Sequence, residues 1–323
     1  MCISERANIV KTAIALLNET GIVVVSVTCD NPATNWSMMT KLGAKLSSPD
    51  PKVSLDLKNI LNVPILVIFD VCHLLKLLRN TLGDYKTLLD DKSNTINWNN
   101  FENLVNVQTS QGLHLANRLR THHIDYKTNK MKTALAAQTF SKSVATSLSY
   151  CKDSLKLKEF EDSEPTINFV KNINDLFDLL NSKSKFGKGC KAPLSKENFE
   201  LWSSKFHEMN VYISSLKHTN GESVLKGARK ATFLGFLVAL KSFRYMFELY
   251  VLTNHLQYIL TFKFSQDHLG KESITFVQSC QNSNYHNFFF LMPGVSFILS
   301  VRNCYYRIST AFYRLRYTVL QIL

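Results

Sequence analysis

The chain has 323 residues, of which 38 are Lys or Arg and 25 are Asp or Glu, so its formal charge is +13 and its pI is near 9.3. Apolar residues make up 45% and there are only 11 Gly and 7 Pro, which excludes a collagen-like, low-complexity or disordered chain. The positive charge favours an anionic partner such as nucleic acid.

Neither a secreted nor a membrane protein is predicted. Glu5, Lys11 and Glu19 interrupt the N-terminal stretch before the apolar core of a signal peptide can form. The most apolar later run, residues 288–299, is far shorter than the roughly 20 residues of a membrane-spanning helix. The 7 cysteines include no C-x-x-C pair, which fits a reducing compartment. We expect a nuclear or cytoplasmic protein with no membrane partner.

The first 83 residues carry the pattern of a parallel α/β layer. Ser4 is predicted to cap a helix that ends at Gly21, and the Val-rich run 22–28 reads as a buried strand. A helix capped by Asn31-Pro32 follows and stops at Gly43, and PILVIF at 64–69 predicts a second buried strand before a third helix.

Strand signals vanish between about residue 84 and residue 262. Helical spacing of apolar residues predicts helices over 98–121, 130–150, 166–182, 196–217 and 230–256. The stripe Phe233, Leu237, Leu240, Phe243 and Phe247 is predicted to be core. With two clear strands, the α/β part has fewer than the roughly four to six of an open sheet, so we expect further strands upstream of this sequence.

Asp30 is the first candidate functional residue, because it follows a buried strand where parallel sheets place ligand and metal sites. A carboxylate there suits Mg²⁺, but Asp30 is equally compatible with capping the next helix. Asp70, with His73 and Lys76, is more typical of helix capping. No Walker-type loop occurs, and FGKGCK at 186–191 is interpreted as a flexible basic loop.

Six segments then follow one another in a familiar order. They are VVVSVTCDNPATNWSMMTKLGA (23–44), VPILVIFDVCHLLKLLRN (63–80), MKTALAAQTFSKSVATSL (131–148), PTINFVKNINDLFDLLNS (165–182), TFLGFLVALKSFRYMFELY (232–250) and LTFKFSQDHL (260–269). Together they resemble P-element-type transposases, including those with an N-terminal THAP zinc finger. The resemblance covers roughly residues 1–269.

The resemblance implies an RNase H-like domain interrupted by a mainly α-helical, GTP-binding insertion domain, with helices in the majority. Such enzymes use three acidic residues to hold two Mg²⁺ ions. Asp30 matches the second acid. Gly270 stands where the third, a Glu, is expected after the S-Q-D-H-L run, and Glu272 faces elsewhere on a helix. The first acid would precede residue 1. We therefore expect a truncated copy that neither cleaves nor joins DNA.

GTP binding is implied separately by the resemblance, since the insertion domain is nearly entire. Asp267 lies in the matching motif, and its carboxylate could accept hydrogen bonds from the guanine N1 and N2 donors; an N-terminal helix acid is the equal alternative.

The predicted division is a partial RNase H-like domain at 1–83, the GTP-binding insertion at 84–225, a helical return at 226–269 and an aberrant tail at 270–323. After Glu272 the tail has no Asp, Glu or Lys.

Two functions remain open. The first is a transposase-like protein that binds GTP and associates weakly or non-specifically with DNA, possible phosphate contacts being Arg118, Arg120, Lys127, Lys130, Lys132 and Lys142. These residues are also compatible with a solvated helical face. The alternative is a helical protein-interaction module with no nucleotide or catalytic role. A second copy of the chain or an intact transposase is the expected protein partner.

Overall fold

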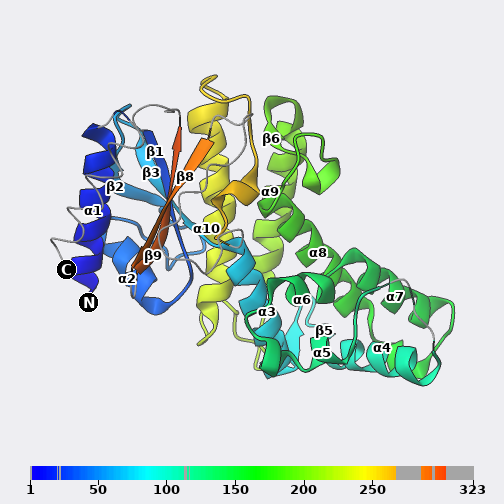
Figure 1. The fold of residues 1–323 in the computed structure, drawn as a ribbon. Helices are drawn as coiled ribbons and strands as arrows, with labels where there is room; N and C mark the ends of the chain where they lie inside the picture. The colour runs from blue at the N-terminus through cyan, green and yellow to red at the C-terminus, as the bar shows by residue number, and fades with distance from the viewer. Residues whose placement is uncertain are drawn as a thin grey trace. The chain divides into compact units, whose positions relative to one another are not determined.

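The computed structural model describes residues 2–19, 21, 23–112, 115, 117–266, 285–292 and 295–302. Its residues form two compact units (Figure 1). The sheet unit comprises the described parts of Met1–Asp70, Pro193–Phe199 and Leu237–Leu323. The helical unit comprises those of Val71–Ala192 and Glu200–Phe236.

The sheet unit is built on a mixed sheet whose described strands run in the order β2 (Ser54–Lys58), β3 (Pro64–Phe69), β1 (Val23–Cys29), β9 (Val295–Arg302) and β8 (Tyr285–Met292). The predicted buried strands are confirmed as β1 and β3, which pair in parallel with Cys29 opposite Phe69. Every residue of β1 is buried, as expected for an unbroken apolar strand in the interior of a sheet. The other pairs in this sheet are antiparallel.

Helices cover the sheet on both sides (Figure 1). On one side lie α1 (Ile3–Glu19) and α2 (Ala33–Lys41), which pack against each other. The C-terminal half of α10 (Lys230–Met246) lies on the other side, where the Ser242 hydroxyl donates to the backbone oxygen of Val67 in β3 at 2.5 Å. The end of α2 at Gly43 is as predicted: this residue has a φ of +106°, which favours glycine.

The start of α1 differs from the prediction. Cys2, rather than Ser4, precedes the helix: its backbone N–H donates to Glu5 Oε2 at 2.7 Å, and the Glu5 N–H donates to Cys2 Sγ at 3.4 Å. This is the reciprocal arrangement of a capping box with sulfur in place of a hydroxyl oxygen.

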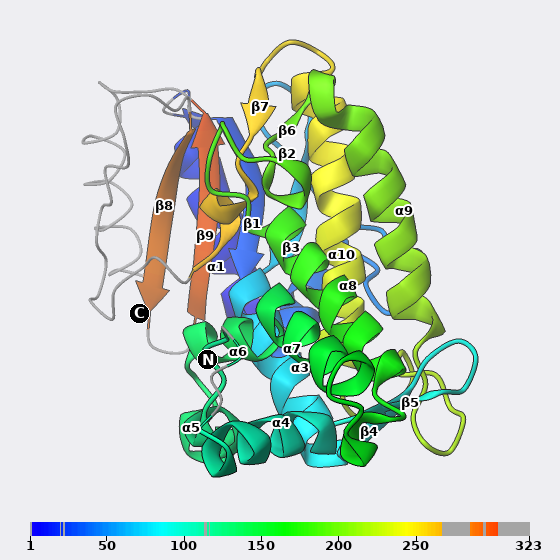
Figure 2. The same cartoon turned by 90° about the vertical axis from the view of Figure 1, so that its right-hand side faces the viewer.

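The helical unit contains helices throughout, as predicted, in the arrangement of Figure 2. They are α3 (Val71–Tyr85), α4 (Asn99–Ser110), α5 (Thr121–Ile124), α6 (Thr133–Thr139), α7 (Lys142–Asp153), α8 (Glu164–Leu180), most of α9 (Phe199–Ser215) and the first half of α10. No helix among the described residues is long and apolar enough to cross a membrane.

The predicted boundaries were too generous in three places. The helix expected over 98–121 ends at Ser110, and the one expected over 130–150 divides at Phe140, so that Ser141 precedes α7. The helix expected over 230–256 becomes a π-helix over Phe247–Val251. In each case the spacing of apolar residues predicts one longer α-helix, because that spacing continues past the point where the α-helix ends.

The expectation of no strands between residues 84 and 262 was wrong. Short antiparallel pairs join β4 (Thr87–Leu89) to β5 (Thr95–Asn97) and β6 (Leu194–Ser195) to β7 (Tyr258–Ile259). Pairs of two or three residues are too short to show a period of two in the sequence.

Aromatic rings fill the core of the helical unit. Phe140 lies between Phe101 and Phe169 in edge-on contacts, with ring centroids 6.1 and 5.7 Å apart. Trp98 adds a tilted contact to Phe101. His123 is buried here as a hydrogen-bonded core histidine, with Nε2 at 2.8 Å from Gln138 Oε1. The predicted apolar stripe from Phe233 to Phe247 is also buried.

Candidate functional site

Two carboxylates meet at the carboxyl edge of the sheet. Asp30 directly follows β1 and Asp70 directly follows β3, and the Asp70 N–H donates to the Cys29 backbone oxygen at 2.9 Å. Because Cys29 and Phe69 are paired in register, the two aspartates leave the sheet from neighbouring strands at the same level.

Asp30 is partly buried and is held by the helix that follows it. The Asn35 side chain donates from Nδ2 to Asp30 Oδ1 at 2.5 Å. The N-cap of α2 is Pro32, and no side chain caps it. The structure therefore places Asp30 at the strand end, as the sequence predicted, but not as the cap of α2. Its catalytic role stays a prediction.

Asp70 is buried and holds a distant segment of the same unit. Its Oδ1 accepts from the Ser265 hydroxyl at 2.6 Å and from the Gln266 N–H at 3.3 Å. Burial, and then the nearby carboxylates of Asp30 and Asp70, raise the pKa of the Cys29 thiol well above its usual value. Cys29 is therefore a protonated, structural thiol at neutral pH.

The described residues do not assemble a metal centre. Among them no group of three His, Cys, Asp or Glu side chains is placed to hold an ion. Asp267 and Gly270, which the sequence analysis singled out, lie outside the described residues. The donor set described here does not fit a two-Mg²⁺ centre, and Asp30 as a Mg²⁺ ligand stays a prediction.

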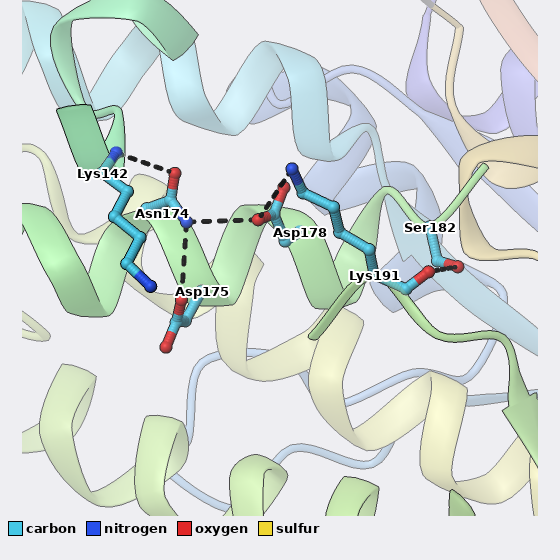
Figure 3. A network of polar contacts seen from close by, with 6 residues as sticks. All are labelled: Lys142, Asn174, Asp175, Asp178, Ser182 and Lys191. Atoms are coloured by element: carbon cyan, nitrogen blue, oxygen red, sulfur yellow. Dashed lines mark hydrogen bonds and ion pairs between the residues drawn. The ribbon is translucent and has the colours of Figure 1, made fainter. Parts of the chain in front are cut away.

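A second polar site lies on α8 in the helical unit (Figure 3). Asn174 is its centre: Nδ2 donates to Asp178 Oδ2 at 3.1 Å and to Asp175 Oδ1 at 3.4 Å, while Oδ1 accepts from the backbone N–H of Lys142 at 3.2 Å. Lys191 Nζ lies 3.7 Å from Asp178 Oδ2. We call Lys142, Asn174, Asp175, Asp178 and Lys191 the α8 network.

Asp178 is the unusual member of the α8 network. Its side chain is 22% exposed, and burial raises its pKa above the usual range although Lys191 acts in the opposite direction. The contacts to Asn174 and Lys191 both fall on Oδ2, so Oδ1 makes no hydrogen bond to a described residue. A half-buried carboxylate with one open oxygen is suited to accepting a donor from a ligand.

Positive charge borders this carboxylate. The α8 network reaches the N-terminus of α7, where the first helical N–H is that of Lys142. A helix N-terminus and lysine ammonium groups both favour phosphate oxygens. On the other side the Lys191 segment is tied down, because the Ser182 hydroxyl donates to the Lys191 backbone oxygen at 2.9 Å. The α8 network thus places a half-buried carboxylate, that of Asp178, close to lysines from two other segments.

The large cavity of the helical unit has the opposite character. Its volume is about 1140 Å³, and its lining includes the carboxylates of Asp90, Asp91, Glu159, Glu161, Asp162 and Glu164. Of the basic residues, Lys92 and Lys158 contribute to the lining. A nucleoside triphosphate would meet net repulsion there, so the α8 network is the better candidate for a nucleotide.

Sequence reasoning did not find the α8 network. Asn174 and Asp178 are one helical turn apart, but a polar pair at that spacing usually marks a solvated face. Lys142 and Lys191 come from separate segments, and only the fold brings them to α8. Helix α8 itself was predicted, with Pro165 near its start as expected.

Two protein-family models match the chain. Residues 1–43 match the TNP-like RNase H N-terminal domain, and residues 72–193 match the TNP-like GTP-binding insertion domain. The first range contains Asp30 and the second contains every member of the α8 network.

Known proteins with similar sequences are transposases. The human DNA transposase THAP9 is 32% identical over 266 residues, which cover 82% of this chain and 29% of THAP9. The transposable element P transposase of Drosophila melanogaster is 26% identical over 263 residues, covering 78% of this chain and 32% of that protein. The chain therefore spans about a third of the length of these relatives.

The fold is also similar to a solved structure. The Drosophila P element transposase strand transfer complex matches with a TM-score of 0.66 and 24% identity. The match covers 79% of this chain and 55% of the other chain. At this identity the match shows the fold, an RNase H-like domain with an inserted helical domain.

The raised pKa of Asp178 predicts how the stability of the protein depends on pH. Because its folded-state pKa is raised, ionisation costs stability, and this cost appears as the pH rises through that pKa. We expect Asp178→Asn to unfold at higher urea concentration than the wild type at pH 7, with the difference shrinking towards pH 4.

Glu164→Gln is the control of opposite sign. A hydrogen bond from Lys152, at 2.6 Å, lowers the pKa of Glu164, so its ionised form stabilises the fold. Its variant should be less stable than the wild type at pH 7 and approach it as the pH falls. An Asp178→Asn midpoint below that of the wild type at pH 7 would contradict this account.

Proposed function

Because the chain belongs to the P-element-type transposase-like family, we propose that it binds GTP through the α8 network, associates with DNA and does not itself cleave DNA. The observation that carries this proposal is the half-buried Asp178, which has an open Oδ1 within the region matching the GTP-binding insertion domain.

Guanine would be recognised by its hydrogen-bond donors. Guanine presents N1–H and N2–H side by side, and a carboxylate accepts both, whereas adenine presents an acceptor at N1. Asp178 offers the open Oδ1 for this role, and Asn174 holds its Oδ2 in place. Lys191 pairs with Asp178, so the phosphates are left to the side chain of Lys142 at the N-terminus of α7. Asp267 remains a further proposed contact.

Association with DNA is supported by the chain's charge and by several exposed lysines. Of the six basic positions singled out in the sequence, Arg118, Lys127, Lys130, Lys132 and Lys142 are exposed. Arg120 is used locally, since its guanidinium donates to the Leu119 backbone oxygen at 2.6 Å. These lysines would contact phosphates without reading sequence. The DNA site, and a second copy or an intact transposase as partner, are not specified by these residues.

The absence of cleavage is inferred from the acids within this sequence. Asp30 would stand without the Glu expected at position 270, where Gly270 is found. Asp70 is the other carboxylate at this edge, and its Oδ1 already accepts from Ser265 and Gln266, so Asp30 and Asp70 do not make up the three acids that hold two Mg²⁺ ions. GTP would therefore act as a bound cofactor and not as part of a strand-transfer reaction by this chain alone.

Thermal unfolding with GTP or ATP tests the nucleotide proposal. A ligand that binds only the folded state at 100 times its Kd adds about 2.7 kcal/mol to stability, so GTP should raise the Tm and ATP should not. Asp178→Asn should weaken GTP binding roughly 10- to 150-fold, as expected for losing a hydrogen bond to a charged group worth about 1.5–3 kcal/mol. Asp162→Asn, the same change in the acidic cavity, should have no effect.

Three results would contradict the nucleotide proposal. Equal increases in Tm with GTP and ATP would show that the guanine base is not recognised. GTP binding by Asp178→Asn as tight as that of the wild type would show that the α8 network is not the binding site. The absence of any shift at saturating GTP would favour the alternative, a helical protein-interaction module.

A nicking assay with supercoiled DNA tests the absence of cleavage. The wild type and Asp30→Ala should give the same background with Mg²⁺, because Asp30 has no complete set of acids around it. Mg²⁺-dependent nicking by the wild type that Asp30→Ala abolishes would overturn this part of the proposal.

A further inference from the structure

The loop between α8 and β6, residues 183–191, presents an exposed aromatic ring among lysines. Phe186 is 78% exposed, and its ring has Lys185 Nζ 4.7 Å from its centroid. The loop sequence KSKFGKGCK contains four lysines and no acidic residue. Lys183, Lys185 and Lys188 are exposed. A single exposed apolar side chain is common on protein surfaces, but the ring of Phe186 is exposed among cations.

Hydrogen bonds define the shape of this loop. Its ends are closed by the Ser182 hydroxyl, which donates to the Lys191 backbone oxygen, and Ser182 is only 1% exposed. At the tip, the Gly187 N–H donates to the Ser184 backbone oxygen at 3.1 Å, and the Phe186 N–H donates to Ser184 Oγ at 3.2 Å. This turn sets the backbone position from which Phe186 projects.

The geometry of the loop requires one of its glycines and favours the other. A Cβ on Gly187 would lie 1.9 Å from the Lys191 backbone oxygen, so no other residue fits there without moving the loop. Gly189 has a φ of +57°, in the left-handed region. The sequence analysis interpreted residues 186–191 as a flexible basic loop; the structure describes a turn at its start, and its flexibility stays a prediction.

We propose that loop 183–191 binds unpaired nucleic acid, with a base stacked on Phe186 and backbone phosphates neutralised by Lys183, Lys185 and Lys188. An exposed ring bordered by cations is the combination that single-strand binding uses, because every base has a face to stack and every nucleotide has a phosphate. A duplex offers phosphates to the lysines but no free base face to the ring. This proposal takes nucleic acid as the polymer from the proposed function and does not depend on GTP.

The test measures binding of a labelled oligothymidylate of about 15 nucleotides, which stays unpaired, and of a duplex of equal length. Phe186→Ala should weaken single-strand binding roughly 5- to 150-fold, the range of one base–aromatic stack, and leave duplex binding unchanged. Phe186→Trp should retain binding, and Phe186→Leu should lose as much as Phe186→Ala. Tyr150→Ala, which removes another exposed aromatic ring, should behave as the wild type.

Salt dependence tests the lysines. Replacing Lys183, Lys185 and Lys188 together with Gln should flatten the slope of log K against log salt by about 2, since each single-strand phosphate contact contributes about 0.7. Lys191 is left unchanged because it belongs to the α8 network. The matched triple variant replaces Lys92, Lys171 and Lys226, which are exposed and form no ion pair with a described residue, and it should keep the wild-type slope.

Gly187→Ala tests whether binding needs the shape of the loop or only its positive charge. It keeps every lysine and the ring but displaces the turn, so single-strand binding should fall. Single-strand binding of wild-type affinity by Phe186→Ala or by Phe186→Leu would overturn the proposal. If only Phe186→Leu retained it, an apolar contact with a protein would be favoured. Equal losses for duplex and single strand would also overturn it. A GTP shift without any single-strand binding would refute this loop proposal alone, leaving GTP binding intact.

Discussion

Parallel pairing of β1 with β3 is the contact on which the rest of the structure depends. Both strands are apolar and buried, so neither can face water, and their common direction brings Asp30 and Asp70 to one edge of the sheet. The chain passes from Asp70 directly into α3, where the helical unit begins. Asp70 then holds Ser265 and Gln266 near this edge. The arrangement of this edge is thus kept by side chains whose described roles are structural.

In the helical unit, the candidate binding residue lowers the stability of the fold. Burial of Asp178 makes its ionised form costly, yet Asn174 and Lys191 are arranged to hold it. A carboxylate kept in an unfavourable environment and open at one oxygen is characteristic of a binding group. The acidic cavity has the wrong charge for a nucleotide, so charge favours the α8 network over the cavity. The α8 network lies wholly within the helical unit, so the proposal of GTP binding there does not depend on whether the sheet edge is catalytic.

The elements that the sequence predicted well are those with long apolar patterns. Strands β1 and β3 and helix α8 each bury enough apolar surface to show their period, and Asp30 follows from the end of β1. Strand β2 was missed because it is short, lies at the edge of the sheet and is only partly buried. The α8 network was missed because its members come from three segments joined by hydrogen bonds, which leave no periodic signal. Residues 186–191 were interpreted as a flexible basic loop because no strand precedes them, and nothing in the sequence indicates that the Lys191 backbone leaves room only for glycine at position 187.

Isothermal titration of the wild-type chain with GTP, ITP and ATP tests the central claim most directly. Inosine keeps the N1–H of guanine but lacks the N2 amino group, and adenine lacks both donors on that edge. If Asp178 accepts both guanine donors, GTP should bind most tightly, ITP more weakly and ATP most weakly. Equal affinities for the three nucleotides would show that the base is not read by a carboxylate, and would contradict the assignment of this chain as a guanine-selective binder.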